Sequence, residues 1–181
     1  KKLEIFAQVL GKPTRVAVLV DSNSAVHPRM FDSLAPAARQ WQLELVKIES
    51  GRKPSDVQLA AAFETAVQQK AGAVFVLPDE PFFFGKRAEI VALAAKHRLP
   101  AFYSLREFVD EGGLMSYGES MTASFRSVAD YVGKIAAGAK PGDLPVAQPT
   151  QFELVINMKT AKALGIAIAE SVLVGATEII E

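Results

Sequence analysis

The sequence predicts an α/β fold in which helices cover both faces of a parallel sheet. Short apolar runs rich in β-branched residues alternate with longer stretches of helical period. Two of these runs, 15–21 and 73–77, are apolar almost throughout, which is typical of parallel strands buried on both faces. Repeated strand–helix–strand order implies right-handed crossovers. We therefore expect a doubly wound sheet of about five strands in the order 2-1-3-4-5, with a switch point between the first and third strands.

Each element of this prediction has its own signal. The predicted strands are residues 15–21, 43–48, 73–77, 101–105 and 114–117. The predicted helices between and after them are residues 28–41, 55–69, 84–97 and 121–137. Glycine and proline punctuate these units. The tail is predicted to hold a linker over 139–149, a strand over 152–156 and helices over 158–164 and 169–180.

Composition excludes several classes of function. The 20 basic and 20 acidic residues balance, so no basic excess favours nucleic acid as a partner. The absence of cysteine excludes a disulfide framework and a thiolate metal site or nucleophile. No apolar run reaches the roughly 18 residues of a membrane span. Neither histidine has a second histidine at ligand spacing, and no nucleophile elbow or phosphate loop is present. We expect no catalytic residue, metal or cofactor.

The candidate ligand site follows from the strand ends. In open α/β sheets the ligand crevice lies outside the carboxyl ends of the strands. Those ends combine hydrogen-bonding groups with aromatic rings, the mixture that small-molecule pockets use. The alternative is that polar residues follow strands only because loops are polar. The candidate ligand residues are Asp21, Ser22, Asn23, Asp79, Phe83, Tyr103, Ser104, Arg106 and Tyr117.

A phosphoacceptor receiver domain is an alternative from another class. Asp21, Asp79 and Ser104 end the first, third and fourth predicted strands, where such a domain keeps two acids and a hydroxyl. That chemistry also needs a second acid beside the first and a lysine after the fifth strand. Val20 and the Tyr117-Gly118 pair stand there instead, so the charge clamp would be missing.

Most of the chain resembles the family of ABC transporter substrate-binding proteins that includes binders of tryptophan and other aromatic amino acids. The resemblance rests on LPDEPFFFGKRAEIVALAAKHRLPAFYSLREFVDEGGLMSYG over 77–118, on YVGKIAAGAK and LPVAQPT, and on FELVINMKTAKALG over 152–165. Departures also occur. Asp21-Ser22-Asn23 stands where the family commonly has an Asn-Pro element, and Glu119-Ser120-Met121 replaces a commoner Pro-Ser.

The resemblance implies one lobe of a type I periplasmic binding protein, with a first lobe and a signal or lipoprotein peptide preceding Lys1. Residues 1–118 would be a crossover helix and the ligand-binding lobe, and residues 119–181 would cross between lobes. The resemblance also implies a protein that is periplasmic, or extracellular and membrane-anchored. Its two lobes would close on a solute as a hinge, and an ABC permease would recognise the closed form. A non-transport ligand sensor that uses the same lobe is the alternative.

Two candidate contacts follow from this reading, each with a structural alternative. Arg106 would clamp a solute carboxylate, or would pair with Glu107 or Asp110. Asp79 would take a solute ammonium, or would cap the following helix.

Two predicted helices carry apolar stripes that need a covering surface. The first stripe is Leu3, Phe6, Val9 and Leu10, and the second is Met121, Phe125, Val128, Val132 and Ile135. The resemblance implies that both pack partly on the first lobe. For this chain alone we expect a homodimer in which copies cover each other's stripes. The alternative is that both stripes belong to the core of the single lobe.

Overall fold

The computed structural model describes residues 1–10, 15–51, 56–78 and 82–181. Its strands are β1 (Arg15–Val20), β2 (Glu44–Glu49), β3 (Ala73–Val76), β4 (Ala101–Tyr103), β5 (Met115–Glu119), β6 (Phe152–Asn157) and β7 (Glu178–Ile180). Its longer helices are α1 (Lys2–Leu10), α4 (Asp56–Gln68), α6 (Arg87–Lys96) and α8 (Met121–Ala136). The shorter helices are α2 (His27–Ser33), α3 (Ala35–Gln40), α5 (Phe82–Gly85), α7 (Glu107–Asp110), α9 (Met158–Leu164), α10 (Glu170–Leu173) and the 3-10 turn Pro141–Asp143.

The strands form one sheet in the order β2-β1-β3-β4-β5-β6-β7. The predicted doubly wound α/β fold and the order 2-1-3-4-5 are confirmed, and two strands extend the sheet beyond β5. All neighbours are parallel except β5 and β6, which run antiparallel. Strand β6 is antiparallel to β5 because the chain leaves the sheet at the end of β5 and re-enters at the same edge, where Phe152 pairs with Glu119.

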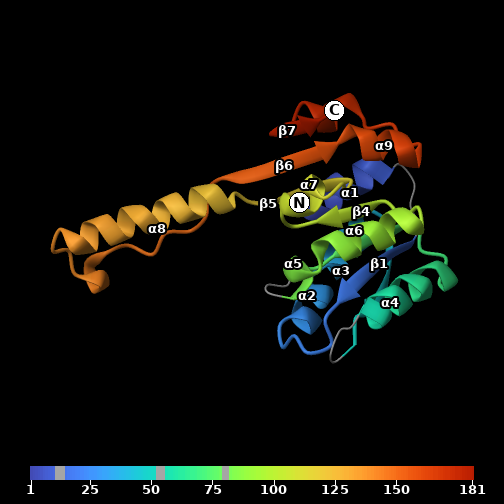
Figure 1. Ribbon diagram of the computed structural model, residues 1–181, viewed down its shortest axis with the longest axis horizontal. Helices are drawn as coiled ribbons and strands as arrows, with labels where there is room; N and C mark the ends of the chain where they lie inside the picture. Colours follow the sequence, from blue (N-terminus) through green and yellow to red (C-terminus); the bar gives the residue numbers. More distant parts are fainter. Residues whose placement is uncertain (11–14, 52–55, 79–81) are drawn as a thin grey trace.

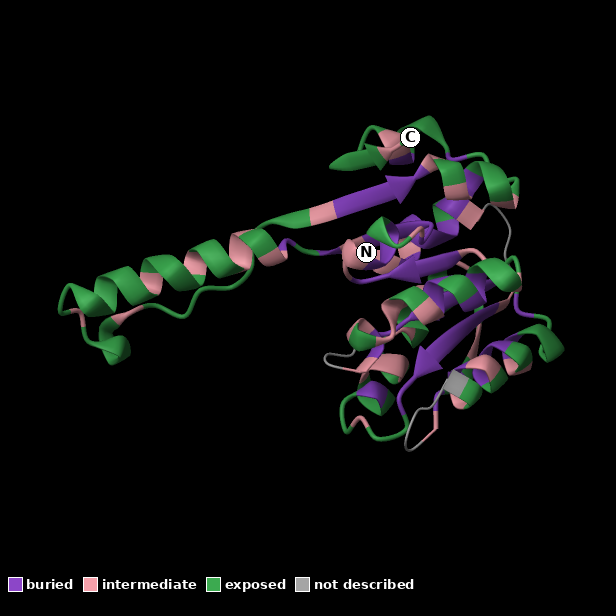
Figure 2. Cartoon of the chain, in the orientation of Figure 1, coloured by how far each residue is buried: buried purple, intermediate pink, exposed green. Residues whose placement is uncertain are grey.

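Alternate residues of the central strands β1, β3 and β4 enter two separate cores. One core holds Phe75 and Phe102 beneath α1, α2 and α3, and it continues to α9 and α10. The other holds Val74 and Tyr103 beneath α4, α5, α6 and α7. The central strands are therefore buried on both faces (Figure 2), as their unbroken apolar runs predict.

Helix α1 belongs to the first core. The ring of Phe6 is fully buried and lies 5.4 Å from that of Phe102, which stacks on Phe75 at 5.1 Å. Leu3 and Val9 are also buried. The expectation that this stripe contributes to a dimer is wrong, because the sheet of the same chain already covers it.

Helix α8 and the segment after it form an arm that projects from the sheet (Figure 1). The side chain of Ser120 caps α8 by accepting a hydrogen bond from the amide of Ala123 at 3.4 Å. No residue of α8 is buried, although the lobe beside it has a continuous core. The return segment leads into β6, so residues 152–180 rejoin the sheet.

Three helix predictions need correction. The helix predicted over 28–41 is two helices, because Pro36 has no amide hydrogen for the carbonyl four residues earlier. The helix predicted over 84–97 begins as α5 and restarts as α6 after Gly85. The last predicted helix, 169–180, is wrong beyond Leu173: residues 178–180 pair with β6 as strand β7. The open edge of β6 supplies backbone partners that local propensity does not reveal.

Candidate functional site

The carboxyl edge of the sheet begins with the turn after β1. Asp21 is 8% exposed, and its Oδ1 accepts hydrogen bonds from the backbone and side-chain nitrogens of Asn23 at 2.8 and 3.2 Å. Ser22 and Asn23 are exposed at this edge. Ser22 Oγ donates to Glu49 Oε2 at 3.1 Å, at the end of β2. The pKa of Glu49 is lowered by hydrogen bonds from Lys47 and then Ser22, so this carboxylate stays charged.

A buried histidine joins this turn to the end of β3. The amide of Asp21 donates to His27 Nδ1 at 2.9 Å, and His27 Nε2 lies 3.0 Å from the carbonyl oxygen of Pro78. Because a backbone amide only donates and a carbonyl only accepts, the hydrogen of the ring is on Nε2, and Nδ1 is the acceptor. His27 is 1% exposed and its ring lies 5.8 Å from that of Phe83. Sequence reasoning missed this role, because both partners are backbone groups, one of them 51 positions away.

Two candidate residues near this link have different outcomes. Asp79 lies outside the described residues. Phe83 is 1% exposed and packs in the core beneath α5. The prediction that Phe83 lines the crevice is therefore wrong, because its ring fills the space between that short helix and the sheet.

The ends of β4 and β5 bring a lysine to the edge. Lys2 Nζ, at the start of α1, donates to Ser104 Oγ at 3.1 Å. Burial lowers the pKa of Lys2, and the nearby charge of Glu119 opposes that shift. The strand ends approach closely here: a Cβ on Gly118 would lie 1.8 Å from the carbonyl oxygen of Ser104. Sequence reasoning missed Lys2, because only the packing of α1 on the sheet brings it to Ser104.

The two candidate tyrosines point to opposite faces of the sheet. Tyr103 pairs with Ser116 across the parallel strands, so Tyr117, one residue further, has the opposite orientation. Tyr103 is 1% exposed and stacks on Phe108 at 4.8 Å, whereas Tyr117 is half-buried and stacks on Phe152 at 5.8 Å. The expectation that Asp79, Tyr103, Arg106 and Tyr117 line one crevice is therefore wrong for Tyr103, which belongs to the core.

Arg106 is held between two carboxylates. Its Nη1 lies 3.0 Å from Glu178 Oε2, and its Nε lies 3.4 Å from Asp110 Oδ2. The hydrogen bond to Glu178, and then that to Asp110, raises the pKa of the guanidinium. The alternative of a pair with Asp110 is confirmed. The second partner was not expected, and it ties α7 to the C-terminal strand β7.

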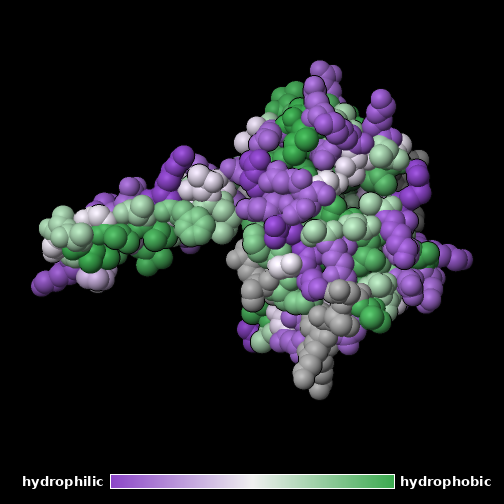
Figure 3. Space-filling model, in the orientation of Figure 1, coloured by the Kyte–Doolittle hydropathy of each residue, from purple (hydrophilic) through white to green (hydrophobic). Residues whose placement is uncertain are grey.

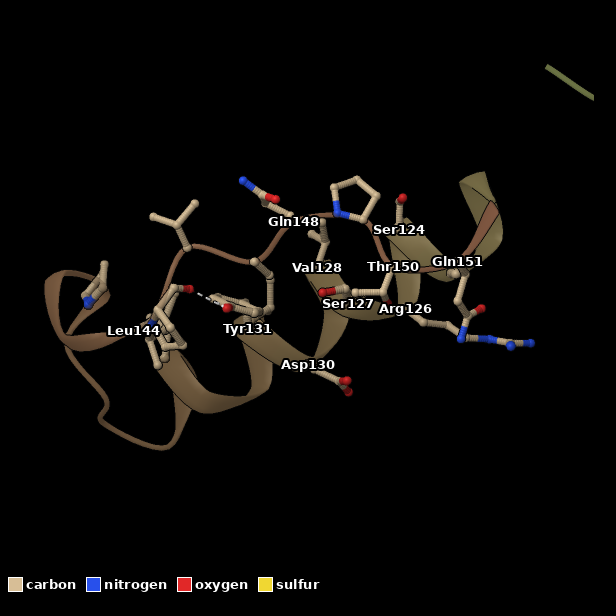
Figure 4. A pocket seen from close by; sticks show the side chains of 18 residues that line it. Ser124, Arg126, Ser127, Val128, Asp130, Tyr131, Leu144, Gln148, Thr150 and Gln151 are labelled. Carbon is tan, nitrogen blue, oxygen red and sulfur yellow. Dashed lines mark hydrogen bonds between the residues drawn. The ribbon is translucent and has the colours of Figure 1, made fainter. Parts of the chain in front are cut away.

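The arm encloses a groove of about 880 Å³ between α8 and the segment 141–151. In Figure 4 the Tyr131 side chain points from α8 toward this segment, and its hydroxyl donates to the carbonyl of Pro145. Asp130 points away from the segment. The apolar stripe beside the groove is largely exposed: Phe125 by 66%, Val128 by 59%, Val132 by 60% and Ile135 by 43%. Apolar surface is visible along the arm in Figure 3.

The described residues bring no three histidine, aspartate or glutamate side chains together as a metal site. Among the helices of the described ranges, none is long and apolar enough to span a bilayer. The edge therefore consists of hydroxyls, amides, lysines and paired carboxylates beside an apolar arm. These groups can bind a small polar solute through hydrogen bonds.

Comparison with known proteins places the chain in a family. Residues 1–180 match the family described as ABC transporter substrate binding protein. A tyrosine-binding protein of Clostridioides difficile (strain R20291) is 22% identical over 166 residues, which are 91% of this chain and 46% of the relative. A Streptococcus pneumonia ABC domain in complex with L-Trp is 24% identical with a TM-score of 0.83, over 99% of this chain and 60% of that one. A conserved domain protein of Vibrio cholerae is also 24% identical, with a TM-score of 0.81, over 98% of this chain and 58% of that one.

The chain thus spans about half the length of the curated relative, and somewhat more of the two solved structures. The match to the family extends over nearly every residue, including α1, the arm and the tail strands. The chain belongs to the ABC transporter substrate-binding protein family.

Proposed function

We propose that the chain is one lobe of a two-lobed solute-binding protein, and that its solute is an amino acid with an aromatic side chain. Two findings support the solute class: a relative is named a tyrosine-binding protein, and a similar structure holds L-Trp. The proposed first lobe corresponds to the additional length of the relatives. The protein would bind its solute without chemical change.

The observation that carries the two-lobe proposal is the arm. Its stripe exposes four large apolar side chains in a row on a helix that has no buried residue. Monomeric proteins rarely leave a large contiguous apolar patch uncovered. The arm leaves the sheet at the carboxyl edge, where a second lobe would complete a solute cleft. In this proposal residues 1–118 form the solute-binding lobe, and residues 119–181 begin as the crossing arm and return through β6.

The proposed solute contacts lie along the edge. Ser22 and Asn23 offer exposed hydrogen-bonding groups at the end of β1, and Asp21 orients Asn23. Ser104 supplies a hydroxyl already joined to Lys2 at the other end. The half-buried ring of Tyr117 would pack on the solute body.

Two charged contacts are proposed for the amino acid backbone. Asp79 would take the solute ammonium. Arg106 would take the solute carboxylate, and for that its guanidinium must exchange Asp110 or Glu178 for the solute. A bidentate bond between a guanidinium and a carboxylate is stronger than a screened surface pair, which makes such an exchange favourable in a closed cleft.

The complete protein would act outside the cytoplasmic membrane, in the periplasm or held at the cell surface, and deliver its solute to an ABC permease. The family assignment supports this setting. The hinge between lobes would couple solute binding to permease recognition, because only the closed form presents both lobes together.

Calorimetry with L-tyrosine and L-tryptophan tests the proposal. The complete two-lobed protein should bind one of them at least 100-fold more tightly than the 181-residue chain, because a lone lobe supplies only part of the cleft. In the complete protein, Asn23→Ala should weaken binding about tenfold or more, while Arg39→Gln on the remote helix α3 should leave it unchanged. Equal affinity of both chain lengths would contradict the two-lobe proposal, and no binding of either amino acid would contradict the solute class.

For the 181-residue chain on its own, we propose that a second copy covers the arm. Of the two stripes, the one on α8 is exposed and would make this contact, whereas α1 is buried in its own lobe. Two arms that pair along their stripes would form a twofold interface, the commonest symmetry of homodimers.

A further inference from the structure

A second cavity lies at the opposite end of the sheet from the proposed solute cleft. It has a volume of about 350 Å³ and is bounded by α6 and α9, with β4 between them. Ala101 begins β4, and Leu114 directly precedes β5, so the cavity lies toward the amino ends of these strands. Pockets for small ligands have volumes from about 300 Å³ upward. This cavity is therefore large enough for a molecule the size of a single aromatic ring with one or two substituents.

Tyr103 lines this cavity and supplies a hydroxyl group. Tyr103 is 1% exposed, and its ring is held by stacking on Phe108. Burial raises the pKa of Tyr103, so the hydroxyl stays protonated and can donate. A guest molecule that carries an acceptor would take a hydrogen bond from this hydroxyl.

The charge around the cavity has one sign. Among the described residues that line it, Arg98 and Lys159 are basic and none is acidic. Arg98 Nη2 donates to the carbonyl of Ala163 at 3.3 Å, which holds the guanidinium against α9 and leaves other donors of the group for a ligand.

The walls of the cavity are apolar and fixed. Val91 and Ala94 line one side on α6, and Leu164 lines the other on α9. Thr160 Oγ1 donates to the carbonyl of Gly112 at 2.8 Å, which joins α9 to the loop before β5. The cavity thus combines apolar walls, one tyrosine hydroxyl and two cations at a single place.

We propose that this cavity is a second binding site, which takes a small monocarboxylate with an apolar or aromatic body. The body lies between α6 and α9, Arg98 and Lys159 hold the carboxylate, and the Tyr103 hydroxyl bonds to a polar group of the guest. The site does not use the carboxyl edge or the arm. Its occupancy is therefore independent of the proposed first lobe and of the solute bound there.

Titration of the 181-residue chain with 4-hydroxybenzoate, followed by amide NMR, tests this site. The amides of Gly112, Gly113 and Thr160 should shift together, with a dissociation constant on the order of 1 mM, as expected for about ten heavy atoms. The uncharged analogue 4-hydroxybenzamide should bind at least tenfold more weakly. Shifts confined to other residues, or equal affinity for the two compounds, would overturn the assignment.

Variants separate the parts of the site. Arg98→Gln combined with Lys159→Gln should weaken 4-hydroxybenzoate binding tenfold or more, and Tyr103→Phe should weaken it several-fold without changing the fold. Ala163→Leu should block the cavity. Arg39→Gln removes one positive charge on the other face of the sheet and should have no effect. If Arg39→Gln weakens binding as much as the paired variant does, the effect comes from net charge and the site assignment fails. If Tyr103→Phe binds as tightly as the unsubstituted chain, the Tyr103 hydroxyl does not contact the guest.

Discussion

The two amphipathic helices α1 and α8 have the same kind of apolar stripe and opposite fates. In α1 the stripe is buried: Phe6 is fully covered and stacks on the rings of the central strands. In α8 four residues of the stripe, Phe125, Val128, Val132 and Ile135, are 43–66% exposed, and the helix projects from the sheet. An apolar stripe shows that a helix needs a covering surface, but not which surface provides it. Four predictions test this difference.

The largest effect is expected from Phe6→Ala. Removal of a buried aromatic ring from a packed core costs about 3–5 kcal/mol of unfolding free energy. The matched change on the arm, Phe125→Ala, should cost less than about 0.5 kcal/mol, because its ring is 66% exposed. Urea denaturation of the dilute chain measures both. Similar losses for the two variants would show that the arm packs on the lobe after all.

A smaller effect is expected from two glycine replacements. Gly118→Ala places a Cβ 1.8 Å from a backbone oxygen, which forces β4 and β5 apart and should cost about 1–3 kcal/mol. Gly133→Ala on α8 meets no atom within 4 Å and should strengthen the arm helix by about 0.5–1 kcal/mol. Denaturation reports the first change, and amide hydrogen exchange along α8 reports the second. A stabilising Gly118→Ala would contradict the close approach of these strands.

The third prediction concerns self-association rather than folding. Val128→Ser with Val132→Ser should turn the expected dimer of the 181-residue chain into a monomer, because both side chains lie in the exposed stripe. The unfolding free energy of the lobe should change by less than about 0.5 kcal/mol. Light scattering at high micromolar concentration reads the oligomeric state, and Val57→Ser, at an exposed valine of α4, is the control. A chain that is monomeric before any substitution would contradict the dimer.

The smallest effect is expected from Lys2, where α1 meets the carboxyl edge. Burial lowers its pKa below the ordinary value of 10.5, so the unfolded chain binds the proton more tightly than the folded chain. This group therefore disfavours folding while protonated in both states, and stability should rise with pH as it approaches 10.5. Denaturation between pH 8 and pH 10.5, about the range in which lysine deprotonates, should show a shallower rise for Lys2→Met. Identical slopes would show that Lys2 is not held in a buried setting.

At the carboxyl edge, too, the sequence indicates which residues lie there but not what each side chain contacts. That polar residues gather at the strand ends could be predicted, since parallel strands end on one edge. Which of them face a solute could not. Phe83 and Tyr103 are aromatic, as residues of ligand pockets often are, but both pack in the core. Arg106 is already paired with Asp110 and Glu178. His27 and Lys2 reach the edge only through partners distant in the sequence.

The sequence by itself determined the strands, their order and most helices, because hydrophobic period and turn residues act over short distances. Tertiary structure alone decided the rest. The register that sets Tyr103 beside Ser116 also turns Tyr117 to the other face, since a strand alternates with a period of two. Strand β7 formed where a helix was predicted, because β6 left an open edge beside it. Helix α1 packs on the sheet and α8 does not. Which surface covers a helix depends on the tertiary arrangement, and the local sequence pattern does not specify it.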